Sequence, residues 1–121
     1  MSSAPVPEGI SERALRNGYG TYEPSLARRD REWYVDILTQ AIAAGFRHFD
    51  SAQMYGTEEM LRDAIDRSGV DRRELFVATK LDLDVMGYDD VLRTADESRR
   101  RLGVDIIDLF YVHVPVETYD P

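Results

Sequence analysis

The chain has 121 residues, 43% of them hydrophobic, and a formal net charge of -8, which suits one small domain and argues against nucleic acid as a partner. It contains no cysteine and two histidines, so the composition excludes disulfide frameworks and thiol chemistry and predicts no metal site. No apolar run reaches the length of a membrane span, and the N-terminus does not resemble a secretory signal, so we expect a cytoplasmic protein without membrane contact.

Residues 1–16 are irregular and rich in proline and serine, and we expect a loose segment there, ahead of a domain at residues 17–121. Within that domain, short apolar runs predict strands near residues 17–22, 46–50, 75–80 and 106–113. The third and fourth runs are apolar on both faces. That pattern is typical of strands covered on both sides in a parallel sheet.

Helices are predicted between these strands, at residues 30–45, 57–69 and 88–103. Each has apolar residues at helical spacing, which gives it one buried face. These residues are Trp33, Tyr34, Ile37, Leu38, Ala41 and Ile42 in the first helix, Met60, Leu61, Ala64 and Ile65 in the second, and Val91, Leu92, Ala95 and Leu102 in the third.

The ends of the predicted helices carry residues suited to those positions. Asp30, Thr57 and Asp89 lie near the starts, where a short side-chain oxygen can accept hydrogen bonds from free backbone N–H groups. Glycine adopts the left-handed conformation that ends a helix at little cost. One glycine follows each helix: Gly45, Gly69 and Gly103.

The alternation of strands and helices predicts right-handed βαβ units and an α/β fold. The repeat is regular, with about 30 residues from one strand end to the next. A complete TIM (β/α)8 barrel takes about 250 residues. We therefore expect parallel β/α units that make about half of such a barrel.

Residue types capable of catalysis or recognition occur where the predicted strands end. In parallel α/β sheets, binding and reacting groups gather at the C-terminal ends of the strands. These ends carry Tyr22, Asp50, Lys80 and His113, and Tyr55 follows shortly after the second strand. Lys80 is the only lysine of the chain, and every other basic residue is arginine.

These side chains suit the reduction of a carbonyl group. A carboxylate such as Asp50 would hold a buried Lys80 ammonium charged, and an ammonium beside a tyrosine hydroxyl lowers the pKa of a tyrosine below about 10. Such a tyrosine can donate a proton to a forming alkoxide, while a neutral His113 can hydrogen-bond the same oxygen. No side chain supplies a hydride, so a nicotinamide cofactor would be required.

Each of these residues also has a simpler interpretation. Lys80 could be a surface lysine whose ammonium reaches water, and His113 could be a packed histidine. Asp50 could cap a loop, and Tyr55 could be an ordinary aromatic residue. We interpret His48, two residues before Asp50, as structural. A site is favoured because the candidates occur together, at the same end of successive strands.

Three segments resemble the N-terminal half of the aldo/keto reductases: GFRHFDSAQMYGTEEMLRDAI, ELFVATKL and SRRRLGVDIIDLFYVHVP. The resemblance covers residues 18–116 and implies a TIM barrel that reduces aldehydes and ketones with NADPH, or with NADH. It implies that Tyr55 is the proton donor, that Lys80 and Asp50 tune it, and that His113 orients the substrate. It also implies a set of cofactor-binding residues: Gly20, Thr21, Tyr22 and Asp50.

The sequence lacks the second half of that family's barrel, which carries most cofactor contacts and the substrate loops. We therefore expect a fragment that is inactive alone and whose missing partner is the C-terminal half-barrel. Two alternatives stay open. The chain could be a half-barrel that closes by self-association, or a non-catalytic α/β interaction module that keeps the motifs.

Overall fold

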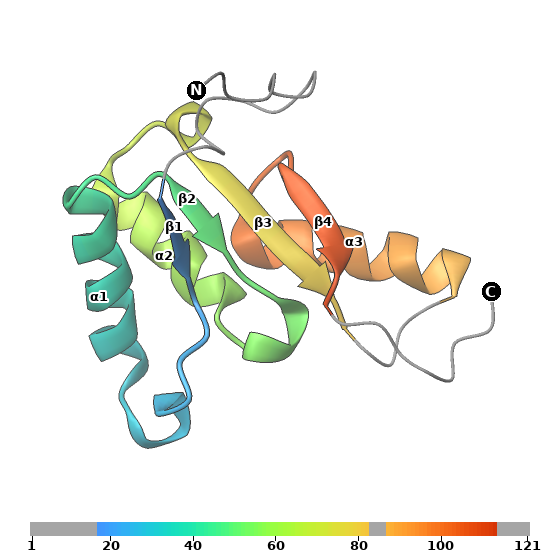
Figure 1. Ribbon diagram of the computed structural model, residues 1–121, viewed down its shortest axis with the longest axis horizontal. Helices are drawn as coiled ribbons and strands as arrows, with labels where there is room; N and C mark the ends of the chain where they lie inside the picture. The colour runs from blue at the N-terminus through green and yellow to red at the C-terminus, as the bar shows by residue number, and fades with distance from the viewer. Residues whose placement is uncertain (1–16, 83–86, 114–121) are drawn as a thin grey trace, which may run out of the picture.

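The computed structural model describes residues 17–82 and 87–113, and four parallel strands within them form one sheet in chain order (Figure 1). The strands are β1 (Gly18–Gly20), β2 (His48–Asp50), β3 (Phe76–Leu81) and β4 (Leu109–Val112). The helices are α1 (Arg31–Ala43), α2 (Glu58–Ser68) and α3 (Tyr88–Leu102), and the short helical turns are η2 (Leu26–Arg28), η3 (Gln53–Tyr55) and η4 (Arg72–Glu74). The predicted α/β fold, with parallel β/α units covering part of a barrel, is confirmed. The loose segment expected at residues 1–16 lies outside the described residues.

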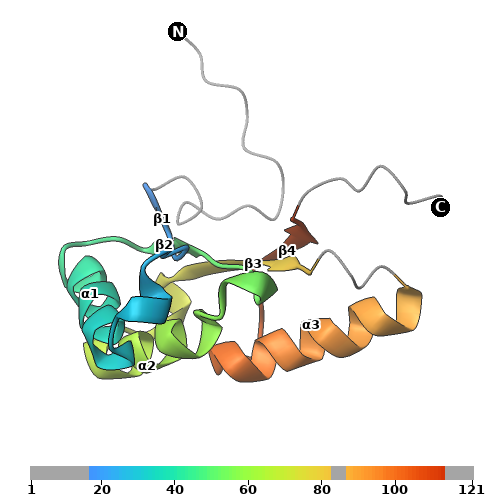
Figure 2. The same cartoon turned by 90° about the horizontal axis from the view of Figure 1, so that it is seen from below.

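The helices α1, α2 and α3 pack on one face of the sheet, and no helix of the described residues covers the other face (Figure 2). Because side chains alternate along a strand, each strand sends one set of residues into the core and the other onto this open face. Phe49 and Val77 are fully buried in the core, whereas Asp50 and Ala78 line a hollow on the open face. None of the helices in the described ranges is both long and apolar enough to cross a membrane.

The core lies between the sheet, α1 and α2. Leu38 and Ile42 of α1 and Leu61 of α2 are fully buried against Phe49 and Val77. Burial of each large apolar side chain stabilises the fold by about 1.5–3 kcal/mol. The apolar faces predicted for the first two helices are therefore confirmed. Three of the predicted residues lie half-buried at their margins: Trp33, Ile37 and Met60.

The apolar face predicted for α3 is wrong in part. Of its four residues, Leu102 is buried, Leu92 is 55% exposed and the other two are half-buried. The residues that α3 buries instead are Thr94 and Ser98, which lie two turns and one turn before Leu102. Their small size lets the helix approach the loop after β2, where the Gln53 amide donates to the Thr94 carbonyl and the Ser98 hydroxyl, both at 3.1 Å.

The two strands expected to be covered on both faces differ in the structure. Every residue of β3 is buried, as predicted. In β4, by contrast, Leu109 is 46% exposed and Val112 is 50% exposed, so that prediction is wrong for β4. The reason is topological, since β4 is an edge strand of a sheet whose second face has no cover in the described residues.

The predicted helix caps are confirmed in part. The Asp30 carboxylate accepts a hydrogen bond from the backbone N–H of Glu32 and caps α1. Thr57 stands at the cap position of α2, but its hydroxyl does not cap the helix. Asp89 lies inside the first turn of α3, whose cap position is Gly87. The helix-ending glycines have the predicted positive φ angles: Gly45, Gly69 and Gly103.

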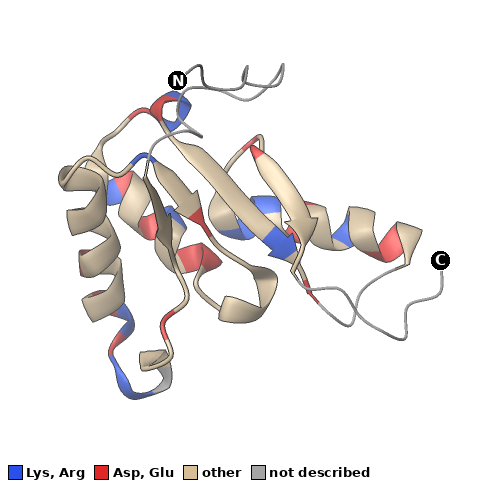
Figure 3. Cartoon of the chain, in the orientation of Figure 1, with Lys and Arg blue, Asp and Glu red and all other residues tan. Residues whose placement is uncertain are grey.

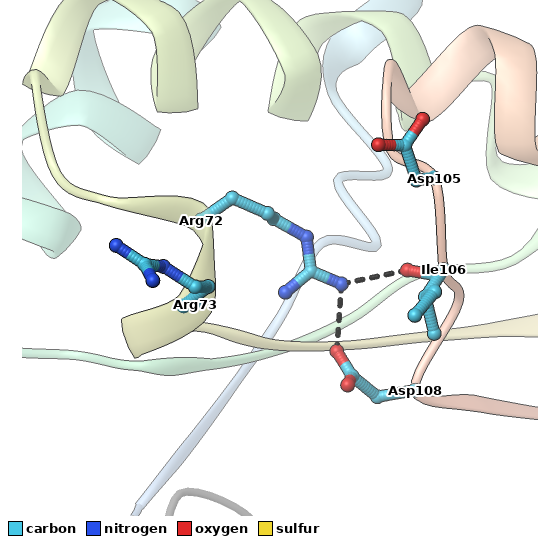
Figure 4. A pocket seen from close by; sticks show the side chains of 5 residues that line it. All are labelled: Arg72, Arg73, Asp105, Ile106 and Asp108. Atoms are coloured by element: carbon cyan, nitrogen blue, oxygen red, sulfur yellow. Dashed lines mark hydrogen bonds and ion pairs between the residues drawn. The ribbon is translucent and has the colours of Figure 1, made fainter.

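An arginine joins the loops at the N-terminal ends of β3 and β4 (Figure 4). The Arg72 guanidinium donates to the Ile106 carbonyl at 2.8 Å and to the Asp108 carboxylate at 2.7 Å. The same Asp108 oxygen accepts from the backbone N–H of Val77 at 2.8 Å. These contacts lie at the end of the sheet opposite to Lys80, where barrel residues serve stability.

A buried carboxylate connects α2, β3 and α3. Glu58 is 2% exposed and accepts hydrogen bonds from the Thr79 hydroxyl at 2.9 Å and from the Arg101 guanidinium at 2.8 Å. A buried carboxylate is tolerated only where charge and hydrogen bonds compensate it. The Glu58–Arg101 pair therefore fixes α3 against α2.

We expect Arg101→Leu to lower the free energy of unfolding by about 3 kcal/mol, because it leaves the Glu58 carboxylate buried without its counter-charge. The measurement is urea unfolding followed by circular dichroism. Arg93→Leu is the matched control, since Arg93 lies on the same helix with its side chain 58% exposed in pairs with Asp90 and Glu97, which are worth about 0–1 kcal/mol. Equal losses in the two variants would contradict a special role for the buried pair.

Candidate active site

Charged residues of the sheet lie near the ends of the strands (Figure 3). Asp50 is the last residue of β2, Lys80 is the penultimate residue of β3, and His113 directly follows β4. Tyr55 ends the turn η3, a few residues after β2. Because the strands are parallel and adjacent, these four predicted residues lie at the same end of the sheet, where the strands have their C-terminal ends.

Asp50 and Lys80 form an ion pair on the open side of the sheet. The Lys80 ammonium donates to Asp50 Oδ2 at 2.9 Å and to the Ser51 carbonyl at 2.8 Å. The Lys80 side chain is 8% exposed, and that of Asp50 is 33% exposed.

The ammonium of Lys80 is stabilised by its surroundings although it is buried. Burial by itself lowers the pKa of Lys80, but the hydrogen bond and charge of Asp50, with the hydroxyls of Tyr55 and Tyr111, outweigh it and raise this pKa above its ordinary value. Lys80 is therefore a stable cation at neutral pH.

Tyr55 lies between this cation and His113. The Lys80 nitrogen is 4.8 Å from the centre of the Tyr55 ring, and the ring meets the His113 imidazole edge to face at 5.4 Å. Tyr22 packs on the same ring at 5.3 Å. Three of the predicted strand-end residues thus surround Tyr55. The Tyr55 ring therefore has a cation on one side and an imidazole close by.

His113 is held by packing against Tyr55. Its Nδ1 is buried and has no hydrogen-bond partner in the part of the chain that the structure describes. No described side chain therefore fixes which ring nitrogen carries the proton.

The residues expected near a cofactor occupy different environments. Gly20 pairs with Asp50 in the sheet register, and a Cβ built at Gly20 would meet no atom within 4 Å. Tyr22 is 64% exposed. Gly20, Tyr22 and Asp50 thus border open space and could contact a bound ligand.

Thr21 differs from the other expected cofactor residues. Its side chain is fully buried, and its hydroxyl lies 2.9 Å from the hydroxyls of both Ser51 and Thr57. The side chain of Thr21 is therefore enclosed in a hydroxyl cluster that joins the end of β1 to the loop after β2. That Thr21 lies near a bound cofactor, as the resemblance implies, stays a prediction.

Tyr111 of β4 also belongs to this site, although it is not among the residues predicted from the sequence. Its hydroxyl donates to Asp50 Oδ1 at 2.8 Å, and its ring lies 5.3 Å from the Lys80 nitrogen. A signal was present, because Tyr111 precedes His113 by two residues and therefore lies on the same face of the strand.

The open face carries a hollow that continues from the ion pair along the sheet. It is lined by Gly18, Gly20, His48, Asp50, Ala78, Leu109 and Tyr111. His48 packs its ring against Phe76 at 4.8 Å, which agrees with a structural role. Within residues 17–82 and 87–113, no group of three or more histidine and acidic side chains is placed to hold a metal ion.

A sequence profile described as the Aldo/keto reductase family matches residues 16–121. Morphine 6-dehydrogenase of Pseudomonas putida is 42% identical over 112 residues, which are 93% of this chain and 36% of that protein. A protein named aldo-keto reductase from Mycobacterium sp. (strain KMS) is 47% identical over 79 residues, which are 65% of this chain and 29% of that protein. The chain spans about a third of the length of the curated relatives it matches.

The chain is also similar to solved structures of aldo-keto reductases. The crystal structure of an aldo-keto reductase from Bombyx mori in complex with NADP aligns with a TM-score of 0.76 and 36% sequence identity. The alignment covers 82% of this chain and 34% of that one.

Proposed function

Because the chain belongs to the aldo/keto reductase family, as its three motifs predicted, we propose that it supplies the catalytic residues of an NADPH-dependent reductase of aldehydes and ketones. NADH is the alternative cofactor. The observation that carries this proposal is the arrangement of Asp50, Lys80 and Tyr55, in which a buried ion pair lies against a tyrosine ring. The substrate class is a small molecule with a reactive carbonyl group.

In the proposed reaction, the nicotinamide cofactor supplies the hydride to the carbonyl carbon when it is bound. Tyr55 donates its phenolic proton to the carbonyl oxygen as negative charge develops there. Lys80 stabilises the resulting phenolate, and Asp50 keeps the ammonium charged and in place. His113, packed against Tyr55, hydrogen-bonds the same carbonyl oxygen and orients it.

Three residues of the chain fit a flat ring bound beside the ion pair. Gly20 leaves space next to Asp50, since a side chain at this position would extend into the open hollow. Tyr22 presents an exposed aromatic ring to the same region. We propose that Gly20, Tyr22 and Asp50 contact the nicotinamide end of the cofactor, and that Thr21 supports them through its buried hydroxyl cluster.

A second proposal concerns what covers the open sheet. Within the described residues, β1 and β4 are the edge strands of the sheet, and such edges offer unpaired backbone groups. Apolar residues are exposed on β4, in the loop before it and on α3: Leu109, Val112, Ile106 and Leu92. In the reductase these surfaces would be covered by a C-terminal half-barrel. The alternative is an interaction module that buries them by self-association, and a chain that is monomeric by sizing chromatography would contradict that alternative.

The reductase proposal can be tested by completing the barrel. We would join this chain to the C-terminal part of the Pseudomonas putida relative, beyond its matched segment. The expected result is oxidation of NADPH that depends on an added aldehyde, with no turnover by the 121-residue chain alone. A folded chimera that oxidises neither NADPH nor NADH with any carbonyl of a broad panel would contradict the proposal.

A further inference from the structure

The two oxygens of the Asp50 carboxylate have different partners. Oδ2 accepts from the Lys80 ammonium at 2.9 Å, and Oδ1 accepts from the Tyr111 hydroxyl at 2.8 Å. Donors on two neighbouring strands therefore hold the carboxylate from both sides. A carboxylate held by one donor can rotate about its side-chain bonds, whereas one held by two has a fixed plane.

We propose that Tyr111 is a positioning residue, whose hydroxyl fixes the Asp50 carboxylate and thereby holds the Lys80 ammonium beside Tyr55. This inference rests on the proposed function and extends its set of residues. It assigns a role to a side chain that neither touches the reacting carbonyl in the proposed reaction nor belongs to the predicted set of four.

The fold places Tyr111 for this role. Tyr111 is the register partner of Lys80 in the parallel pair of β3 and β4. Its ring lies 5.3 Å from the Lys80 nitrogen, within the range of a cation–π contact. The groups that face it are Asp50 of β2 and Lys80 of β3, with the Tyr55 ring 4.8 Å from the same ammonium and His48 lining the same hollow.

The two tyrosines beside Lys80 differ in their charged neighbours. Burial and the hydrogen bond to Asp50 raise the pKa of Tyr111, and Lys80 opposes them in part, so the net direction is upward. Tyr111 therefore keeps its proton and remains a donor to Asp50. Tyr55 has the same ammonium 4.8 Å from the centre of its ring. Tyr111 is therefore the tyrosine whose hydroxyl holds Asp50, and proton donation stays with Tyr55 as in the proposed function.

The pKa of Lys80 can be measured directly on this chain. Because the sequence has one lysine, a sample labelled with 13C-lysine shows a single lysine side-chain signal, whose pH titration reports the pKa of Lys80. We expect Tyr111→Phe to lower this pKa by about half a unit, because the substitution keeps the ring and removes the hydroxyl that hydrogen-bonds Asp50. Asp50→Asn should lower it by about one unit or more. Tyr88→Phe removes an exposed hydroxyl on α3 and should leave it unchanged.

The outcomes separate this inference from the function on which it rests. If Asp50→Asn shifts the Lys80 titration and a folded Tyr111→Phe does not, the positioning role is overturned and the ion pair stands. If neither variant shifts the Lys80 titration, the Asp50–Lys80 ion pair is contradicted, and so is the proposed function. Should Tyr111→Phe not fold, the Tyr111 ring signal can be titrated in Asp50→Asn. A lowered Tyr111 pKa there supports the contact, and an unchanged one overturns the inference.

Discussion

Tyr55→Phe should lower kcat of the completed barrel by about 10²–10⁴-fold with little change in KM. The substitution removes the phenolic proton and keeps the ring, so the contacts of that ring with His113 and Tyr22 are retained. A group that acts on the transition state and not on substrate binding affects kcat and kcat/KM equally. The measurement is steady-state kinetics of cofactor oxidation with a reactive aldehyde.

The control for this prediction is Tyr88→Phe, because Tyr88 is 80% exposed on α3, outside the proposed site. Its kcat should equal that of the parent chimera. If Tyr55→Phe also keeps the parent kcat, Tyr55 is not the donor. A loss confined to KM would mean that the Tyr55 hydroxyl binds substrate and does not transfer the proton.

The sequence was informative wherever local pattern and topology agree. Parallel strands must carry their C-terminal ends to one edge, so the order of Asp50, Lys80 and His113 along the chain was enough to bring them together. The helical spacing of Leu38, Ile42 and their neighbours likewise placed α1 and α2 on the sheet. Both features depend on periods of a few residues, which are visible in a single sequence.

The sequence failed where contacts between distant elements decide the outcome. The hydroxyl cluster around Thr21 could not be foreseen, because its partners Ser51 and Thr57 lie 30 and 36 residues along the chain. Tyr111 looked like a strand residue among apolar neighbours, and its partner Asp50 lies two strands away. No local pattern records such pairings, because they depend on the register between strands.

The buried face of α3 also depends on contacts with a distant element. Spacing alone favoured Leu92 as a buried residue. Thr94 and Ser98 are buried instead, where the Gln53 amide donates to the Thr94 carbonyl and the Ser98 hydroxyl. Leu92 is 55% exposed on α3. In the complete barrel that we propose, the next β/α unit would adjoin the edge strand β4.

We expect Lys80→Met in the completed barrel to lower kcat by about 10²–10³-fold, because the phenolate of the proposed donor would lose its stabilising cation. Methionine fills similar space without charge, so the loss reports electrostatics more than packing. Activity that stays at the parent level would contradict the mechanism, since the proposed Asp50 and Tyr55 roles both act through this ammonium.

Lys80→Arg is the sharper comparison, because it keeps the charge and changes its shape. The Lys80 nitrogen is a compact cation that reaches Asp50 Oδ2 and the Ser51 carbonyl within 3 Å from a side chain that is 8% exposed. A guanidinium is planar and wider, and it prefers bidentate contact with a carboxylate, whose Oδ1 is already bound by Tyr111. We therefore expect Lys80→Arg to be impaired nearly as much as Lys80→Met, and near-parent kcat in Lys80→Arg would show that charge alone is sufficient. Impairment would explain why a chain that uses arginine at every other basic position has its one lysine here.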